Sequence, residues 1–522
     1  MAKYILKRLI HGLFSVIVVV GIVMILVYSL MNREQVFAMD PQFNKVSANR
    51  KITYKHERWE DYGYLDYVNY TEWLTAQVAA GELEEAVRSK VVNLGKDAES
   101  DSEAVAEYVK KFTDYYESQG YTVTRLNTVL AGKKRANGGE PQLFAAKDKP
   151  VLSRLVSYFG HFFQVDSVGS VKDYPGERGL TFTLYDPLYG GQKFSPAIIG
   201  SGTYHKYLLY CDNVFPYIHQ NLLSINMGTS YSIERGAEIT STMGKRQGSY
   251  VLSEVTYPTG LTEMSADDLH TATYQAGSRE SSVLYSGRFT DDYTNVSLFR
   301  SGMSRMGYSF MIGIISVALS YLIGIPMAIW MAQKKDKAVD KIGSVYVVFI
   351  TAMPSLAYIF LVKAIGDRIG LPTTFNIEKY TFAMCVLPII SLALRPIGSQ
   401  MRWLRRYMVD QQNADYVKFA RSGGLSEREI FTEHIFKNAA IPIIHGIPGA
   451  VLFSLTGALI TERVYVVPGV GGLLINAINA YDNAVIVGVT LFYAILSVIS
   501  VILGDVLMSM VDPRITFSTK AR

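Results

Sequence analysis

The chain of 522 residues is 49% hydrophobic and 19% charged, with a mean hydropathy of +0.15. This balance excludes both an ordinary soluble protein and a wholly membrane-buried one, so we expect membrane spans combined with a water-exposed domain. The formal net charge of +5 gives no reason to expect a nucleic-acid partner. Two cysteines, neither with the neighbours of a metal site or redox pair, exclude a disulfide framework.

The first membrane segment is predicted at residues 9–32, where no charged residue occurs. Lys3, Lys7 and Arg8 precede it without an acid, so residues 1–8 are predicted to be cytoplasmic. A secretory signal would have a shorter apolar core and a small-residue cleavage site. We therefore expect a retained transmembrane helix.

Residues 33–302 are predicted to form an extracytoplasmic α+β domain, because no apolar run in this stretch is long enough to cross a bilayer. Residues 70–120 have helical spacing, whereas residues 179–185 and 248–255 alternate like strands. The domain contains several histidines but no HExxH or GxSxG pattern, so a hydrolase is not indicated.

Five further apolar segments are predicted within residues 303–514, which makes six spans in all. The loops and ends predicted to be cytoplasmic carry 3, 4, 7 and 3 lysines and arginines, more than the short loops on the other side. Both termini, including the tail of residues 515–522, are therefore predicted to be cytoplasmic. The five segments are 306–333, 342–362, 380–401, 443–461 and 483–504.

Arg395 stands inside the fourth of these segments. An unpaired charge facing lipid is costly, so its side chain is expected to face a neighbouring helix or an aqueous path. A snorkelling side chain near the interface is an equal alternative, and the sequence leaves both open.

Between the fourth and fifth spans lies a polar stretch, 402–442, that contains an amphipathic pattern. Apolar positions recur at helical spacing on either side of Gly423 and Gly424, which predicts helix, tight turn and helix. Ser426 is predicted to cap the second helix, with Glu427 and Glu429 in its first turn. An apolar stripe at the membrane face indicates a docking partner or, alternatively, headgroup lipid.

This stretch resembles the cytoplasmic coupling loop of ABC-importer permeases of the peptide and nickel family, with the pattern DYVxxARAKGxsxxxixxxHxxxNAxxP. Gly423 departs from it, because the family often has lysine there. The matching positions are Asp415, Tyr416, Val417, Ala420, Arg421, Gly424, His434, Asn438, Ala439 and Pro442. The resemblance implies that residues 416–425, ending at Leu425, dock on a separate ATPase subunit, with Gly424 as the turn.

Weaker similarities lie elsewhere. Gly228, Thr229, Ser230 and Tyr231 resemble the end of the family's GDLGTSY-like motif, and residues 462–472 resemble its E-x-x-F-x-x-PGxG segment. Asp505 and the residues 512–514 match its D and DPR ending. The region from about 33 to 202 has no counterpart in the family core and resembles the long insert of the oligopeptide (Opp/Ami) permeases of Gram-positive bacteria.

The resemblance implies a polytopic α-helical protein of the plasma membrane, with six transmembrane helices in the type I ABC importer permease fold. It implies a transport subunit that is not an enzyme and needs no cofactor or metal. Its partners would be a homologous second permease, two ATPases, a peptide-binding lipoprotein, membrane lipid and the oligopeptide substrate. The chain itself has no GxxxxGK[ST] phosphate loop, and its spans lack Asp and Glu, which agrees with energy supplied by another subunit.

Two other functions are considered. An ATPase-coupled mechanotransmission protein would also carry a large outer domain, but such proteins usually have four spans and lack this loop. A membrane-anchored outer enzyme would show hydrolytic activity in the isolated insert. The insert itself is expected to support docking of the binding protein, to shield the outer gate, or to act only as a stabilising spacer.

Overall fold

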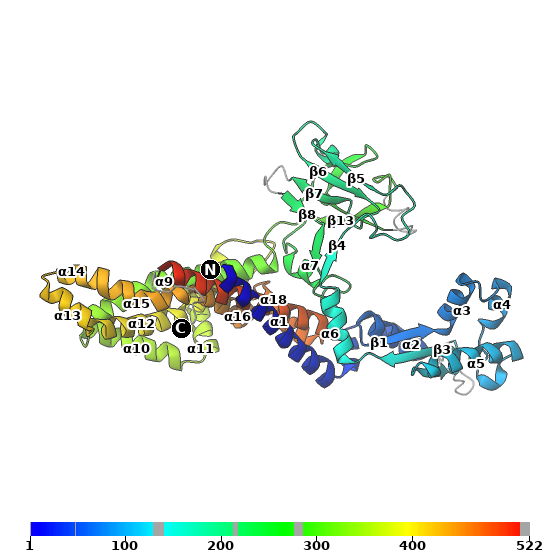
Figure 1. Cartoon of the computed structure of the whole chain (residues 1–522), viewed down its shortest axis with the longest axis horizontal. Coiled ribbons are helices and arrows are strands. Elements are labelled where there is room, and N and C mark those ends of the chain that lie inside the picture. Colours follow the sequence, from blue (N-terminus) through cyan, green and yellow to red (C-terminus); the bar gives the residue numbers. More distant parts are fainter. Residues whose placement is uncertain (1, 47, 129–139, 212–217, 276–285, 512–522) are drawn as a thin grey trace.

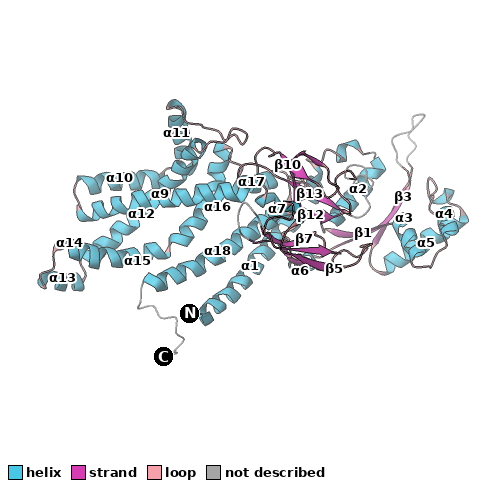
Figure 2. Ribbon diagram, turned by 90° about the horizontal axis from the view of Figure 1, so that it is seen from above, coloured by secondary structure: helices cyan, strands magenta, loops and turns pink. Residues whose placement is uncertain are grey.

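The computed structural model describes residues 2–46, 48–128, 140–211, 218–275 and 286–511. These residues form an elongated molecule with a bundle of long helices at one end and two separate lobes at the other (Figure 1). Seen from the perpendicular direction, strands occur only in the lobes and the bundle is entirely helical (Figure 2). The lobes come from residues 33–302, called the insert below.

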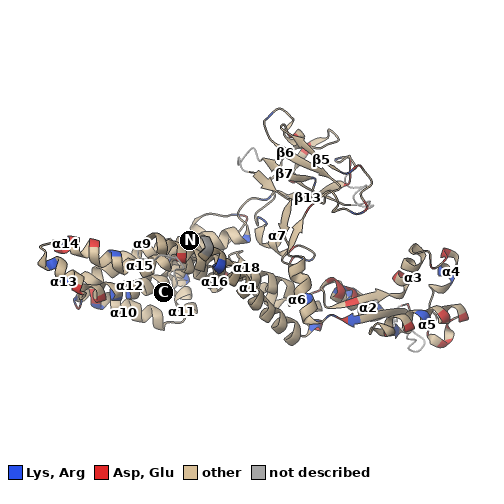
Figure 3. Cartoon of the chain, viewed as in Figure 1, with Lys and Arg blue, Asp and Glu red and all other residues tan. Residues whose placement is uncertain are grey.

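Within the described residues, five helices are long and apolar enough to cross a membrane. A sixth crossing is possible if a bent pair of helices counts as one span. Charged residues are sparse along the middle of the bundle and gather at its free end and on the insert (Figure 3). The five helices are α1 (Ala2–Leu30), α9 (Arg305–Gln333), α12 (Ala383–Gln412), α16 (Ile447–Tyr465) and α18 (Asn483–Val511).

The bent pair differs from the single helix expected over residues 342–362. Helices α10 (Ala338–Ala352) and α11 (Ser355–Arg368) meet at an angle of 111°. Met353 is extended, with ψ 132°, and Pro354 precedes the first residue of α11. A residue before proline is pushed out of the helical region, so Pro354 breaks the apolar run in two.

The remaining spans follow the prediction with shifted ends. Helix α1 already includes residues 2–8, and α12 continues past residue 401 to Gln412. The fifth span is α16, which follows α15 (Lys437–His445), and the short α17 (Val470–Asn479) lies before α18. Helix ends are set by capping and tertiary packing as well as by hydropathy, so such shifts are expected.

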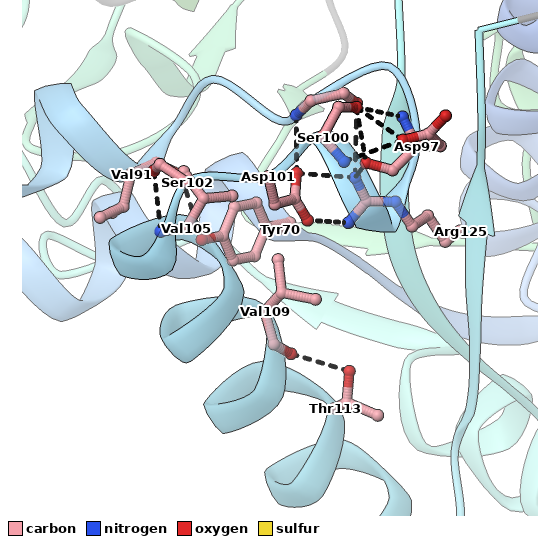
Figure 4. A network of polar contacts seen from close by, with 11 residues as sticks. Tyr70, Val91, Asp97, Ser100, Asp101, Ser102, Val105, Val109, Thr113 and Arg125 are labelled. Atoms are coloured by element: carbon pink, nitrogen blue, oxygen red, sulfur yellow. Dashed lines mark hydrogen bonds and ion pairs between the residues drawn. The ribbon is translucent and has the colours of Figure 1, made fainter.

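The first lobe of the insert is an α+β unit. Its antiparallel sheet has the order β1-β3-β2, formed by β1 (Leu65–Asn69), β2 (Thr122–Leu126) and β3 (Gln142–Asp148). The Arg125 guanidinium makes two hydrogen bonds, of 2.6 and 2.9 Å, to the nearly buried carboxylate of Asp101, as Figure 4 shows. Its helices are α2 (Ala48–Asp61), α3 (Tyr70–Ala79), α4 (Glu85–Val91) and α5 (Glu103–Ser118).

The second lobe is made mostly of strands. A four-stranded antiparallel sheet has the order β5-β6-β7-β8, and three further two-stranded pairs are β4-β9, β10-β11 and β12-β13. The strands are β4 (Phe163–Val165), β5 (Gly179–Thr183), β6 (Ala197–Ser201), β7 (Tyr207–Cys211), β8 (Ile218–Gln220), β9 (Leu223–Ile225), β10 (Ser253–Thr256), β11 (Thr262–Ser265), β12 (Asp267–Tyr274) and β13 (Tyr293–Leu298). The α+β character predicted from residue patterns therefore agrees with the insert as a whole, whose helices lie mostly in the first lobe.

Helix α6 (Val151–Gly160) joins the lobes and lies against the bundle. Leu155 packs 3.5 Å from the position that a Cβ on Gly21 of α1 would take, and the Tyr158 hydroxyl donates to the Met227 carbonyl. The Arg154 guanidinium stacks on the rings of Tyr28 and Tyr64. Both lobes are thus attached to the same end of α1 and α18.

Asp482 is the main polar anchor between the insert and the bundle. This buried carboxylate accepts hydrogen bonds from the Ser230 hydroxyl at 2.7 Å and from the backbone N–H groups of Tyr231 and Ser232 at 2.9 Å. The next residue, Asn483, hydrogen-bonds to Tyr64 of the first lobe. A buried carboxylate needs such donors, so the 230–233 turn and the start of α18 stabilise each other.

We expect Asp482→Ala to release this turn. Loss of a charged acceptor that holds several donors costs about 3 kcal/mol. Hydrogen exchange of the Tyr231 and Ser232 amides should accelerate about a hundredfold. The exposed Asp367 provides the control, because Asp367→Ala should leave those rates unchanged; equal rates in both variants would contradict the anchoring role.

Candidate functional site

The segment of residues 415–442 forms the tip of the bundle farthest from the insert (Figure 1). Helix α13 (Asp415–Ser422) is followed by a turn and by α14 (Glu427–Glu429), which continues without interruption through the π-helix η5 (Ile430–Phe436) into α15. The predicted helix, turn and helix are therefore confirmed, with a π-helical stretch that sequence periodicity did not indicate. Such stretches are rare and often occur at functional positions.

Gly424 makes the turn. Its φ is +82°, a conformation that costs side-chain-bearing residues roughly 1–2 kcal/mol, whereas Gly423 is helical with φ −75°. Ser426 caps the second helix as predicted: its hydroxyl accepts from the Glu429 N–H, and the Glu429 carboxylate accepts from the Ser426 N–H. Gly424 thus occupies the position in the turn that requires a positive φ.

An exposed ion pair connects the two sides of the turn. The Arg421 guanidinium donates to both carboxylate oxygens of Glu427, at 2.6 and 3.1 Å. This hydrogen bond and the positive charge lower the pKa of Glu427, and the Ser426 hydroxyl similarly lowers the pKa of Glu429. Both carboxylates therefore stay ionised at neutral pH. Since the pair is exposed, its contribution to stability is small.

One face of α13 is buried against the bundle. Val417 is fully buried and Ala420 is 8% exposed. They pack in a cluster with Ile430, Ile435 and Ala439 of the following helices, and with residues at the ends of α9 and α12. These bundle residues are Ala328, Ala332, Leu404 and Met408. The apolar packing fixes the 415–442 segment to two long helices.

A small polar cluster adds to this attachment. The Asn438 side-chain amide donates to the His434 carbonyl at 2.8 Å and to the Tyr416 hydroxyl at 3.2 Å. The Tyr416 hydroxyl in turn hydrogen-bonds to Gln411 and to the His434 carbonyl. Tyr416, His434 and Asn438, far apart in sequence, thus act as a structural link between α13 and α15.

The opposite face of α13 is exposed and partly apolar. Phe419 is 78% exposed, and Leu425, just past the turn, is 42% exposed. An aromatic side chain so open to solvent on a well-packed helix typically marks an interaction surface. We call Phe419 and Leu425 the outward apolar patch.

The predicted site residues therefore divide between two roles. Val417 and Ala420 are buried and Asn438 binds Tyr416 within the segment, whereas Arg421 and Leu425 face outward. Asp415 also faces outward, with 97% of its side chain exposed, and Pro442 lies exposed within α15. Phe419 was not among the predicted site residues, although its place two positions after the inward Val417 puts it on the opposite side of a helix.

The 462–472 stretch also forms an ordered feature, at the end of the bundle near the insert. The buried Glu462 carboxylate accepts from the Ser309 hydroxyl at 2.7 Å and from the Gly472 N–H at 2.9 Å. The Val470 N–H donates to the same Ser309 hydroxyl. These bonds tie the start of α17 to α9 and α16. No group of three or more potential metal ligands occurs among the residues placed in the structure.

Comparisons with known proteins agree with this arrangement. Residues 324–517 match the family described as binding-protein-dependent transport system inner membrane component. The oligopeptide transport system permease protein AmiC of Streptococcus pneumoniae is 31% identical over the whole chain and 99% of its own length. The chain belongs to the family of oligopeptide transport system permeases. It is accordingly a polytopic membrane protein of the ABC transporter class.

Other similarities cover less of this permease. The dipeptide transport system permease protein DppB of Lactococcus lactis is 28% identical over 44% of this chain and 77% of its own length. A solved structure, titled as an amino acid ABC transporter with histidines, aligns with 40% of this chain and 92% of its own at 16% identity, with a TM-score of 0.31. AmiC, in contrast, aligns across the insert as well as the bundle.

The turn between α13 and α14 can be tested by substituting its two adjacent glycines. Gly424→Ala should destabilise the 415–442 segment by about 1 kcal/mol, because Gly424 is the one of these two that has a positive φ. Gly423→Ala should be neutral or slightly stabilising in its helical position. Hydrogen exchange of the α13 amides measures the difference, and equal protection in the two variants would refute the assigned turn.

Proposed function

We propose that this permease forms half of the translocation pore of an ATP-driven oligopeptide importer and that the 415–442 segment docks on a separate ATPase subunit. The single observation that carries the docking role is the two-sided character of α13. Val417 and Ala420 fasten it to the bundle, and Phe419 projects into solvent. An apolar side chain anchored on a rigid helix is suited to fill a groove on a partner.

In this proposal, the separate ATPase subunits supply the energy for transport. The sequence has no GxxxxGK[ST] phosphate loop, and the relatives are named as permease proteins of transport systems. ATP binding in two ATPase subunits would move the docked α13 helices, and the long helices α9 and α12 would carry this movement to the pore. ATP hydrolysis therefore belongs to the partners, and this chain acts as a transport subunit without a cofactor.

The proposed topology has six spans, with α10 and α11 together forming a broken third span. Both termini and the 415–442 segment lie in the cytoplasm, and the insert lies outside the cell. The support is the positive charge near α13, where Arg402, Arg405 and Arg406 precede it. The domain boundaries remain those expected from the sequence, with the insert between the first and second spans.

The substrate class follows from the relatives, which are named for oligopeptide and dipeptide transport. The further partners are a homologous permease that forms the other half of the pore and a peptide-binding lipoprotein that delivers substrate. A mechanotransmission protein without transport activity finds no support among these relatives. We infer that the insert supports docking of the binding protein, and its attachment through Asp482 and α6 beside the bundle supports this role over that of a spacer alone.

Truncation of Phe419 tests the docking role. Loss of an aromatic anchor typically costs 2 kcal/mol or more, so Phe419→Ala should weaken ATPase binding about thirtyfold. ATP-dependent peptide uptake in proteoliposomes should fall accordingly, while membrane insertion and thermal stability stay unchanged because the side chain is exposed.

Lys437→Ala is the matched control, since Lys437 is exposed on α15 outside the outward apolar patch. It should retain ATPase binding and uptake. Normal uptake by Phe419→Ala, or full uptake by the purified permease without an ATPase, would contradict the proposed function.

A further inference from the structure

Arg395 lies within the part of α12 that would be inside the bilayer. It is twelve residues from the first residue of α12, Ala383, which corresponds to about 18 Å along the helix. It is seven residues, or about 10 Å, from Arg402, the first residue of the charged end. Whether Ala383 or Arg402 is set at the edge of the hydrocarbon core, a core about 30 Å thick would contain Arg395.

The Arg395 side chain is exposed and unpaired. Within the described ranges, no residue forms a hydrogen bond or ion pair with it, although Tyr358 of α11 lies within electrostatic range. In contrast, Arg405 of the same helix makes two hydrogen bonds of 2.5 Å to the buried Asp340. The open guanidinium of Arg395 is thus a free set of donors at membrane depth.

Arg395 begins a polar stripe along α12. Ser399, Arg402 and Arg406 follow at spacings of four, three and four residues, and all are exposed. This spacing places them on one side of the helix. The other side is buried against the bundle through Ile397, Gly398, Met401, Leu404 and Met408.

Lipid is an unfavourable environment for such a stripe. A charged side chain near the middle of a bilayer is costly, and arginines at such depth almost always face a water-filled cavity or the interior of an assembly. The stripe also runs continuously from membrane depth to the charged end of α12, as a path for a polar solute requires.

We propose that Arg395 lines the translocation path and binds the C-terminal carboxylate of the passing peptide. This inference rests on the proposed function in peptide transport. Every unmodified oligopeptide carries this carboxylate, whatever its side chains, and a guanidinium binds it through two parallel hydrogen bonds. One residue can in this way favour free-acid peptides without selecting their sequence.

The test compares a free-acid peptide with its C-terminal amide in proteoliposomes that contain the assembled transporter and saturating binding protein. In the unchanged transporter, the free acid should be taken up faster. Arg395→Gln should slow uptake of the free acid about tenfold, the loss expected for one charge-assisted interaction, and change uptake of the amide less than twofold. Arg395→Lys should restore part of the difference. Lys335→Gln, which removes an exposed charge from the α9–α10 turn, should have no effect.

Accessibility gives a second measurement that does not depend on transport. With Cys211 and Cys385 replaced by serine, Arg395→Cys should react with a charged, membrane-impermeant thiol reagent. Leu322→Cys, exposed on α9 where lipid is expected, should not react.

The outcomes separate the two proposals. No peptide uptake by the unchanged transporter would refute the proposed function and leave the accessibility result to decide whether Arg395 faces water. An equal loss of acid and amide uptake in Arg395→Gln would overturn the inference in favour of a structural ion pair with the second permease. An unreactive Arg395→Cys would overturn it in favour of a lipid-facing, snorkelling arginine.

Discussion

The packing of Val417 and Ala420 of α13 into one apolar cluster with the following helices and the ends of α9 and α12 is the contact on which the rest of the mechanism depends. Because close-packed side chains transmit displacement, a movement of α13 would pass through this cluster to the bundle. The link from Asn438 to Tyr416 resists sliding of the same helix. A partner that holds Phe419 would therefore act on the long helices and not on a loose loop.

The opposite end of the molecule is held together differently. There the contacts between insert and bundle include buried polar groups, with Asp482 accepting from the 230–233 turn and Asn483 bonded to Tyr64. Polar anchors of this kind are directional and cost much to leave unsatisfied. They fix how the insert is oriented on the bundle.

Some charges of the bundle are held by partners within the described part of the chain, and Arg395 is not. Asp340 with Arg405, and Asp505 with Arg8 and Tyr4, are paired within the chain. Arg395 has no such partner among the described residues. A subunit that forms only half of a pore is expected to leave its path-lining side chains open, because their partners are the substrate or the other subunit.

The motifs of the sequence indicated the family, and its residue pattern determined the apolar segments, the turn at Gly424 and the cap at Ser426. These features depend on local chemistry: hydropathy over about twenty residues, the conformational freedom of glycine and the reach of a serine hydroxyl to its own helix. The third apolar segment proved to be a bent pair of helices. Only the tertiary structure decided which side of α13 is buried, that Phe419 projects outward, and that Asp482 receives the 230–233 turn. Those properties depend on neighbours distant along the chain, and periodicity cannot supply them because it identifies an apolar face without saying what covers it.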